Sequence, residues 1–448
     1  MCNTAQEKEI KGLELSISSA INNAVGYYIL IFVLYIIVTN FSIPVINTLF
    51  VIITLFLGLY LPFEKAICLY PLLLVYFGYT FMPMNTLIPF SFDNTTFEKF
   101  YFICVGIKVI LSHPRLYISR SGKNSLAYLI FGAYMVLSHI LKFQLVDAFY
   151  LISVIAVFLE LKSSKKGLFN FLTFLLFTLI SVYAYNVINM ANNIASFEGA
   201  INLIGWRVNQ FRGVRDPNNF ALYCNFAIAG LLFSGMFDNK YRKYCIAILA
   251  IGVIITISFS GFITLAFIYL YHLFRASKTI SKARSYFIKR AVALLFVIII
   301  ILSFNSILSI LQNSNIGSLS ATANRFSTIY SAYQSGNMDI ATSYRSFYWN
   351  SYLTEFGNMN TFDKLFGDKY LLNSTIEKIG NASHNAYLDY CFNYGIIGLA
   401  LYLVVAAKNL YFNYKNNESF SFLMVGIMLA NFYFRSISGS LLFLPLFI

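Results

Sequence analysis

Long apolar runs recur from one end of this 448-residue chain to the other. Many of them approach the roughly 20 residues that a helix needs to cross the hydrocarbon core of a bilayer. Only 11% of the residues are charged, whereas a water-soluble chain of this size carries about a quarter. The runs therefore predict an all-α polytopic membrane protein that forms a single integral membrane domain over residues 1–448, with about 12–14 transmembrane helices.

About fourteen runs are predicted as spans by their hydropathy. The run at 102–111 is the weakest of them, because it is short and contains Lys108. The predicted spans are 21–38, 41–61, 66–81, 102–111, 126–141, 148–161, 168–190, 220–237, 244–259, 262–274, 291–311, 386–407, 420–434 and 437–448.

Basic residues gather in short clusters between these runs, which is typical of cytoplasmic loops. With a cytoplasmic N-terminus, the clusters at 115–123, 162–166, 240–243 and 275–290 all fall inside. Topology thus accounts for the net charge of +14, and nucleic-acid binding is not expected. The first span is expected to be an uncleaved anchor, because no cleavage pattern precedes it. The six cysteines form no close pairs, so neither a disulfide framework nor a zinc site is expected.

Two segments on the non-cytoplasmic side are longer than ordinary connections, namely 191–219 and 312–385. The second is too long to be an ordinary structureless loop. Within it, aromatic side chains recur at helical spacing, which predicts an amphipathic helix on the membrane surface or over the bundle. These residues are Tyr344, Tyr348, Tyr352 and Phe356, with Trp349 and Leu353 beside them.

The first external segment carries three arginines directly before an Asp-Pro-Asn turn. Arginine presents a planar donor fork that matches phosphate oxygens, and the turn predicts a helix start whose N-terminus adds positive partial charge. The segment could hold a phosphate or pyrophosphate at the membrane surface; binding of lipid headgroups is the alternative. The residues are Arg207, Arg212, Arg215, Asp216, Pro217 and Asn218.

The second external segment ends at His384, the only external histidine in this topology. Imidazole can take a proton from a hydroxyl near neutral pH, and this position meets both water and a membrane-bound substrate. An interfacial histidine that local hydrogen bonds satisfy is the alternative. Gly395 and Gly398, which follow, are interpreted as permitting close helix packing.

Arg345 lies on the predicted amphipathic helix among aromatic residues. It could bind a second phosphate or a sugar, with Trp349 stacking on the sugar face; a surface helix with an ordinary basic residue is the alternative. A Phe366-Gly367-Asp368 stretch follows further along the segment. No HExxH motif, Walker loop or external Asp-x-Asp pair is present in the sequence.

Three motifs in this order resemble the O-antigen polymerase and O-antigen ligase superfamily of bacterial membrane glycosyltransferases. They are Gly213–Ala221 (GVRDPNNFA), Ser258–Gly261 (SFSG), and the long loop that closes on His384-Asn385-Ala386-Tyr387-Leu388. The resemblance covers about the last 250 residues at the level of motifs and the whole chain in hydropathy. One departure is Phe259, because many relatives have an arginine inside the Ser-x-Ser-Gly stretch.

The resemblance implies a GT-C-type fold in the inner membrane, with the active site in the periplasm and without metal, nucleotide or other cofactor. The implied partners are undecaprenyl-diphosphate-linked glycan donor and acceptor and membrane lipids; binding of a chain-length regulator protein stays open. His384, Arg345 and Arg215 are the implied catalytic residues. Implied substrate-binding residues are Arg207, Arg212, Asp216, Asn218, Asn385, Trp349 and Tyr387.

Three functions stay open at this point. A polysaccharide polymerase of lipopolysaccharide biosynthesis is favoured by the full Asp-Pro-Asn turn and by the Phe-Gly-Asp stretch. The ligase of the same superfamily shares the donor and passes the finished chain to lipid A core. A lipid-linked oligosaccharide flippase or other transporter shares the spans and arginines, but the large loop and the scarcity of ionisable groups near span centres count against it.

Overall fold

The computed structural model describes residues 25–38, 43–73, 94–112, 125–142, 144–193, 217–234, 239–255, 258–275, 306, 309, 312–313, 317–341 and 344–434. The regular structure in these ranges is helical, and no strand occurs among them. The all-α prediction is therefore confirmed for this part of the chain. The described residues divide into two compact units, one of 25–180 with 400–425 and one of 181–399 with 426–434.

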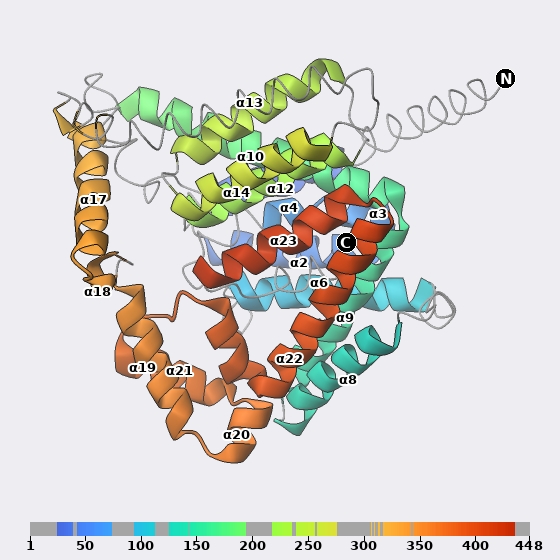
Figure 1. Cartoon of the computed structure of the whole chain (residues 1–448). Coiled ribbons are helices and arrows are strands. Elements are labelled where there is room, and N and C mark those ends of the chain that lie inside the picture. Colours follow the sequence, from blue (N-terminus) through green and yellow to red (C-terminus); the bar gives the residue numbers. More distant parts are fainter. Residues whose placement is uncertain are drawn as a thin grey trace. The chain divides into compact units, whose positions relative to one another are not determined.

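In the first unit, α6 packs against α2 and α9, and α8 packs against α9 (Figure 1). Aromatic rings fill part of this interior, and the ring centroids of Tyr70 and Phe102 lie 4.8 Å apart, edge to face. A Cβ on Gly106 of α6 would lie 2.5 Å from Ser153 Cα of α9, so these helices approach closely. The helices are Val25–Val38, α2 (Pro44–Tyr60), α3 (Phe63–Ala66), α4 (Tyr70–Leu72), α6 (Asn94–Ser112), α8 (Ser125–Leu141), α9 (Leu145–Ser163) and parts of α10 (Lys165–Asn193), α22 (Ala386–Lys415) and α23 (Ser419–Phe434).

Lys108, which weakened the span prediction at 102–111, lies inside the longer helix α6. Its ammonium group donates to the carbonyl oxygens of Tyr60 at 2.8 Å and Leu61 at 2.5 Å. These carbonyls lie at the C-terminal end of α2, where a helix has no further N–H groups of its own to offer. The lysine therefore caps a neighbouring helix, which explains how an apolar helix accommodates it.

In the second unit, α12, α13 and α14 pack against one another. A Cβ on Gly261 of α14 would lie 2.7 Å from the Cβ of Ala221 in α12, so small residues bring these two helices together. The helices of this unit are α12 (Pro217–Phe233), α13 (Asn239–Ile255), α14 (Phe259–Arg275), α17 (Gly317–Gln334), α18 (Met338–Ala341), α19 (Arg345–Asn358), α20 (Thr361–Phe366), α21 (Lys369–Ile379) and parts of α10, α22 (Ala386–Lys415) and α23 (Ser419–Phe434).

The predicted spans that fall mainly on described residues are helical, apart from 66–81, whose described part forms short turns around α4. The predicted helix start at the Asp-Pro-Asn turn is confirmed, because α12 begins at Pro217. Two described helices, Lys165–Val182 and Ala386–Lys415, are long and apolar enough to cross a membrane, and six shorter apolar helices accompany them. The spans 437–448 and nearly all of 291–311 lie outside the described residues.

The described part of the long segment 312–385 is largely helical and contains α17 to α21, drawn in orange in Figure 1. A helix is present where the aromatic spacing predicts one, as α19, although Tyr344 precedes it. Two of its aromatic side chains pack into a small protein core, since Tyr352 is fully buried and Phe356 is partly buried against Phe392 of α22. The remaining buried members of this core are Met359 and Leu372.

Candidate functional site

The candidate residues divide between described and undescribed parts of the chain. Arg207, Arg212, Arg215 and Asp216 lie outside the described residues, as does most of the segment 191–219. The described candidates all lie in the second unit. They are Asn218, Arg345, Trp349, His384, Asn385 and Tyr387.

His384 lies in the short connection between α21 and α22, with an exposed side chain. Its φ of 52° is in the left-handed region, which non-glycine residues rarely adopt. Such conformations often occur at functional sites, where the surrounding structure holds them. His384 therefore combines an accessible imidazole with a backbone that must be held in place.

Asn385 is buried and caps α22. Its side-chain oxygen accepts hydrogen bonds from the backbone N–H groups of Tyr387 at 3.0 Å and Leu388 at 3.3 Å. This is the usual way in which asparagine satisfies the free N–H groups of a helix N-terminus. Asn385, directly after His384, is therefore the N-terminal capping residue of α22.

Arg345 is the first residue of α19 and is half-buried. Tyr344, just before it, has a φ of 63°, and Ser346, just after it, donates to Asp339 Oδ1 at 2.7 Å. These features define where α19 begins. They give Arg345 a set position at the N-terminal end of the helix.

Trp349 joins α19 to the His384 connection, since its indole N–H donates to the carbonyl oxygen of Ser383 at 3.0 Å. Arg345 and Trp349 are four residues apart and therefore share one face of α19. That face meets the backbone directly before His384. The structure thus links the helix that carries Arg345 to the connection that carries His384.

A second pair of contacts, through Asn381, supports the same connection. Tyr352 donates its hydroxyl to the Asn381 carbonyl oxygen at 2.7 Å, and Asn381 Nδ2 donates to the Tyr348 hydroxyl at 2.8 Å. Burial, and then the negative charge of Asp389, raise the pKa of Tyr352 to about 12. Tyr352 is therefore a neutral donor at physiological pH.

Asn218 contacts the Ser258–Gly261 motif, which lies some forty residues further along the chain. Ser258 donates its hydroxyl to Asn218 Oδ1 at 2.6 Å, and the same hydroxyl accepts from the Gly261 N–H at 3.1 Å at the start of α14. Two of the three motifs that carry the family resemblance therefore meet at the beginnings of α12 and α14.

Tyr387 anchors α22 to α23. Its hydroxyl donates to the Leu429 carbonyl oxygen at 2.7 Å, and its ring lies 5.5 Å from that of Phe432. Asn431, on the same helix α23, donates to Thr264 of α14 at 3.2 Å. Helix α23 therefore lies between the His384 motif and the helix that begins with the Ser258 motif.

The close helix packing expected at Gly395 is confirmed, because this glycine of α22 meets the backbone of Leu365 and Phe366 at the end of α20. Its φ of 69° and ψ of −179° interrupt α22, and a Cβ there would lie 2.5 Å from the Phe366 nitrogen. Three residues before this break, the Phe392 carbonyl oxygen accepts a hydrogen bond from the Asp368 N–H at 2.6 Å. The contact therefore joins the Phe366-Gly367-Asp368 turn to a break within α22.

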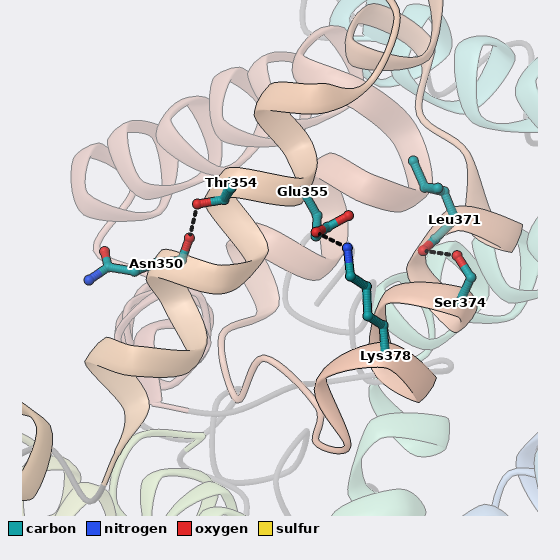
Figure 2. Close-up of polar contacts among 6 residues, drawn as sticks. All are labelled: Asn350, Thr354, Glu355, Leu371, Ser374 and Lys378. Carbon is teal, nitrogen blue, oxygen red and sulfur yellow. Dashed lines mark hydrogen bonds and ion pairs between the residues drawn. The ribbon is translucent and has the colours of Figure 1, made fainter.

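An exposed ion pair also joins α19 to α21 on the surface of the loop helices. Lys378 and Glu355 approach to 2.5 Å, and Figure 2 shows the two side chains reaching across between the helices. Because the lysine side chain is 68% exposed, solvent weakens this attraction. The pair contributes less to holding the loop helices together than the buried contacts of Tyr352.

No group of three or more His, Cys, Asp or Glu side chains that could hold a metal ion occurs in the described ranges. No role is assigned to Ser383, Asp389 or Asn381 from the sequence, although the first two directly flank the motif from His384 to Leu388. Their hydrogen bonds around the connection that carries His384 become visible only in three dimensions.

Comparison of the chain with protein-family models, with curated proteins and with solved structures finds no match in any of the three.

Proposed function

We propose that this chain is an O-antigen-type polysaccharide polymerase, a GT-C-type glycosyltransferase that crosses the bacterial inner membrane several times. It would join undecaprenyl-diphosphate-linked repeat units at the periplasmic face. The apolar runs, the basic clusters between them and the two long apolar helices support the membrane assignment. The order of the three motifs supports the choice of superfamily.

The observation that carries the catalytic part of the proposal is the link between α19 and the His384 connection through Trp349 and Ser383. Through this link, the helix that carries the permanently charged guanidinium of Arg345 contacts the connection that carries the accessible imidazole of His384. A transfer from a lipid diphosphate needs both kinds of group, because the acceptor hydroxyl must lose a proton while negative charge develops on the leaving diphosphate.

In this proposal His384 is the general base on the acceptor hydroxyl. Arg345, together with Arg215 and Arg212, neutralises the charge that develops on the leaving diphosphate. Stabilising developing charge in this way is usually the largest single contribution to catalysis. The N-terminus of α12, which begins at Pro217, adds partial positive charge close to Arg215 in the sequence.

The test is a gel of surface polysaccharide from a deletion strain complemented with the wild-type gene or with variants. We expect His384→Ala and Arg345→Ala to lose the long-chain ladder and leave core plus one repeat unit, at normal protein levels. Lys378→Ala, which removes an exposed positive charge from the same group of helices, is the matched control and should keep the ladder. Normal ladders from both site variants would refute the assignment.

The same gel separates the proposal from the other functions. Loss of a ligase leaves bare core while lipid-linked polymer accumulates. Loss of a flippase also leaves bare core on the gel, while repeat units stay untranslocated on the cytoplasmic leaflet. Either pattern in the deletion strain would replace the polymerase assignment.

A further inference from the structure

Ser383, the residue before His384, is fully buried. Its hydroxyl lies 2.7 Å from Asp389 Oδ1 and 3.0 Å from the Asn385 carbonyl oxygen. A hydroxyl has one proton to donate, and the carboxylate is the stronger acceptor. The Ser383 hydroxyl therefore donates its hydrogen bond to Asp389. The same hydroxyl oxygen accepts from the Asn385 N–H at 2.9 Å.

These contacts hold both peptide groups that flank His384. The preceding peptide is held at its carbonyl, because Ser383 O accepts from the indole N–H of Trp349 at 3.0 Å. The following peptide is held at its N–H, because Asn385 N donates to the Ser383 hydroxyl. The orientations of these two peptide planes define φ and ψ of His384.

That control matters because the φ of His384 is 52°. An L-residue leaves the left-handed region unless the surrounding structure determines its conformation. Ser383 participates in the hydrogen bonds on both sides, once through its carbonyl and once through its hydroxyl. Without the hydroxyl, the peptide after His384 loses its acceptor.

Asp389 supplies the fixed end of this arrangement. It lies in the first turn of α22, where the partial positive charge of the helix N-terminus favours a carboxylate. Its own N–H donates to the Asn385 carbonyl at 3.1 Å. The carboxylate that accepts the hydrogen bond of Ser383 therefore belongs to a residue of a regular helix.

We propose that Ser383 is the positioning residue of His384, with Asp389 as its anchor, and that together they hold the imidazole in the orientation needed for proton transfer. This inference rests on the proposed role of His384 as general base. Ser383 acts through the backbone of His384, so it should affect the rate of the bound complex more than the binding of substrate.

The test is steady-state kinetics of the purified full-length protein with undecaprenyl-diphosphate-linked repeat units. Ser383→Ala should lower kcat by about 10- to 100-fold and leave KM within about twofold of wild type. Ser383→Thr keeps the hydroxyl and should restore most of kcat. Asp389→Asn keeps an acceptor oxygen but loses the charge, so we expect an intermediate fall in kcat.

Ser374→Ala is the matched control. Ser374 belongs to α21 in the same group of helices, and its exposed hydroxyl donates only to the nearby Leu371 carbonyl at 3.0 Å (Figure 2). It should have wild-type kinetics. Thermal unfolding of every variant then shows whether a fall in kcat comes from a mispositioned His384 or from an unfolded protein.

The outcomes distinguish this inference from the function on which it rests. Wild-type kinetics of His384→Ala would refute the assigned base, and with it the proposed mechanism. An inactive His384→Ala beside a fully active Ser383→Ala would overturn the positioning role alone. So would a rise in KM without a fall in kcat, or a fall that Ser383→Thr does not restore. Should Ser383→Ala fail to fold, wild-type kcat from folded Asp389→Asn overturns the role.

Discussion

Gly367 and Gly395 pack backbone against backbone, and a Cβ on Gly367 would lie 2.5 Å from the amide nitrogen of Gly395. Both residues have positive φ, 78° and 69°. Neither position therefore offers the space or the backbone conformation that an ordinary side chain needs. This crossing fixes the turn between α20 and α21 to the break in α22, eleven residues after His384.

Gly395→Ala should lower the free energy of unfolding by about 3 kcal/mol, from a left-handed backbone penalty of about 1–2 kcal/mol and an overpacking cost of about 1–3 kcal/mol. Gly357→Ala is the control, because its Cβ would meet nothing within 4 Å and alanine favours a helix by up to about 1 kcal/mol. Thermal unfolding in detergent measures both. Equal stability of the two variants would contradict the crossing.

Tyr352 makes stability depend on pH in the alkaline range. Its pKa is raised from 10.0 to about 12 in the folded protein, by burial first and by Asp389 second. The folded state thus keeps this proton after the unfolded chain has lost it, so the contribution is complete below pH 10 and falls as the pH rises toward 12.

Tyr352→Phe tests this dependence. At neutral pH the variant should be less stable by about 1 kcal/mol, because the buried hydrogen bond to Asn381 is lost. Between pH 10 and 12 its stability should fall less steeply than that of wild type. Parallel stability curves over that interval would show that Tyr352 does not titrate as described.

Asn218 and Ser258 should be energetically coupled, because one hydrogen bond of 2.6 Å joins them. We expect Asn218→Ala and Ser258→Ala each to cost about 1–2 kcal/mol, and the double variant to cost less than their sum by about 1 kcal/mol. Combining Asn218→Ala with Thr354→Ala, whose hydroxyl bonds within α19, should instead give additive losses within about 0.5 kcal/mol. Additivity of both pairs would contradict the contact between the motifs.

The ion pair of Lys378 and Glu355 should matter little. Glu355→Gln is expected to lower stability by less than about 1 kcal/mol, since exposed pairs lose most of their attraction to solvent and side-chain entropy. The difference from wild type should shrink further in 1 M salt, where the screening length is about 3 Å. A loss of several kcal/mol, or one that salt leaves unchanged, would show a pair more protected than its exposure indicates.

Hydropathy was a good guide to the helices. The predicted runs that correspond to α2, α8, α9 and α23 begin and end within a few residues of these helices. The run predicted at 102–111 covers only about half of α6, because the first part of the helix contains Glu98 and Lys99, and the hydropathy of the run itself is lowered by Lys108. Its charge is satisfied by the carbonyl oxygens at the end of α2, and hydropathy averages take no account of contacts with another helix.

The candidate site was predictable in its members but not in its contacts. Spacing identified the aromatic stripe of α19, and motif order identified His384 and Asn218. Neither could show that Trp349 donates to Ser383 or that Ser258 donates to Asn218. Those contacts join residues that lie 34 and 40 positions apart, and local patterns do not specify pairings over such separations.

Sequence alone predicts that the described chain is helical, that α12 begins at Pro217 and that a helix follows Asn385, because apolar periodicity and capping residues act within a few residues along the chain. The left-handed conformation of His384 and the break of α22 at Gly395 could not be predicted from it and are known from the three-dimensional structure. These features depend on the Trp349 side chain of α19 and on the backbone at the end of α20, which are distant along the chain and therefore do not enter any local pattern.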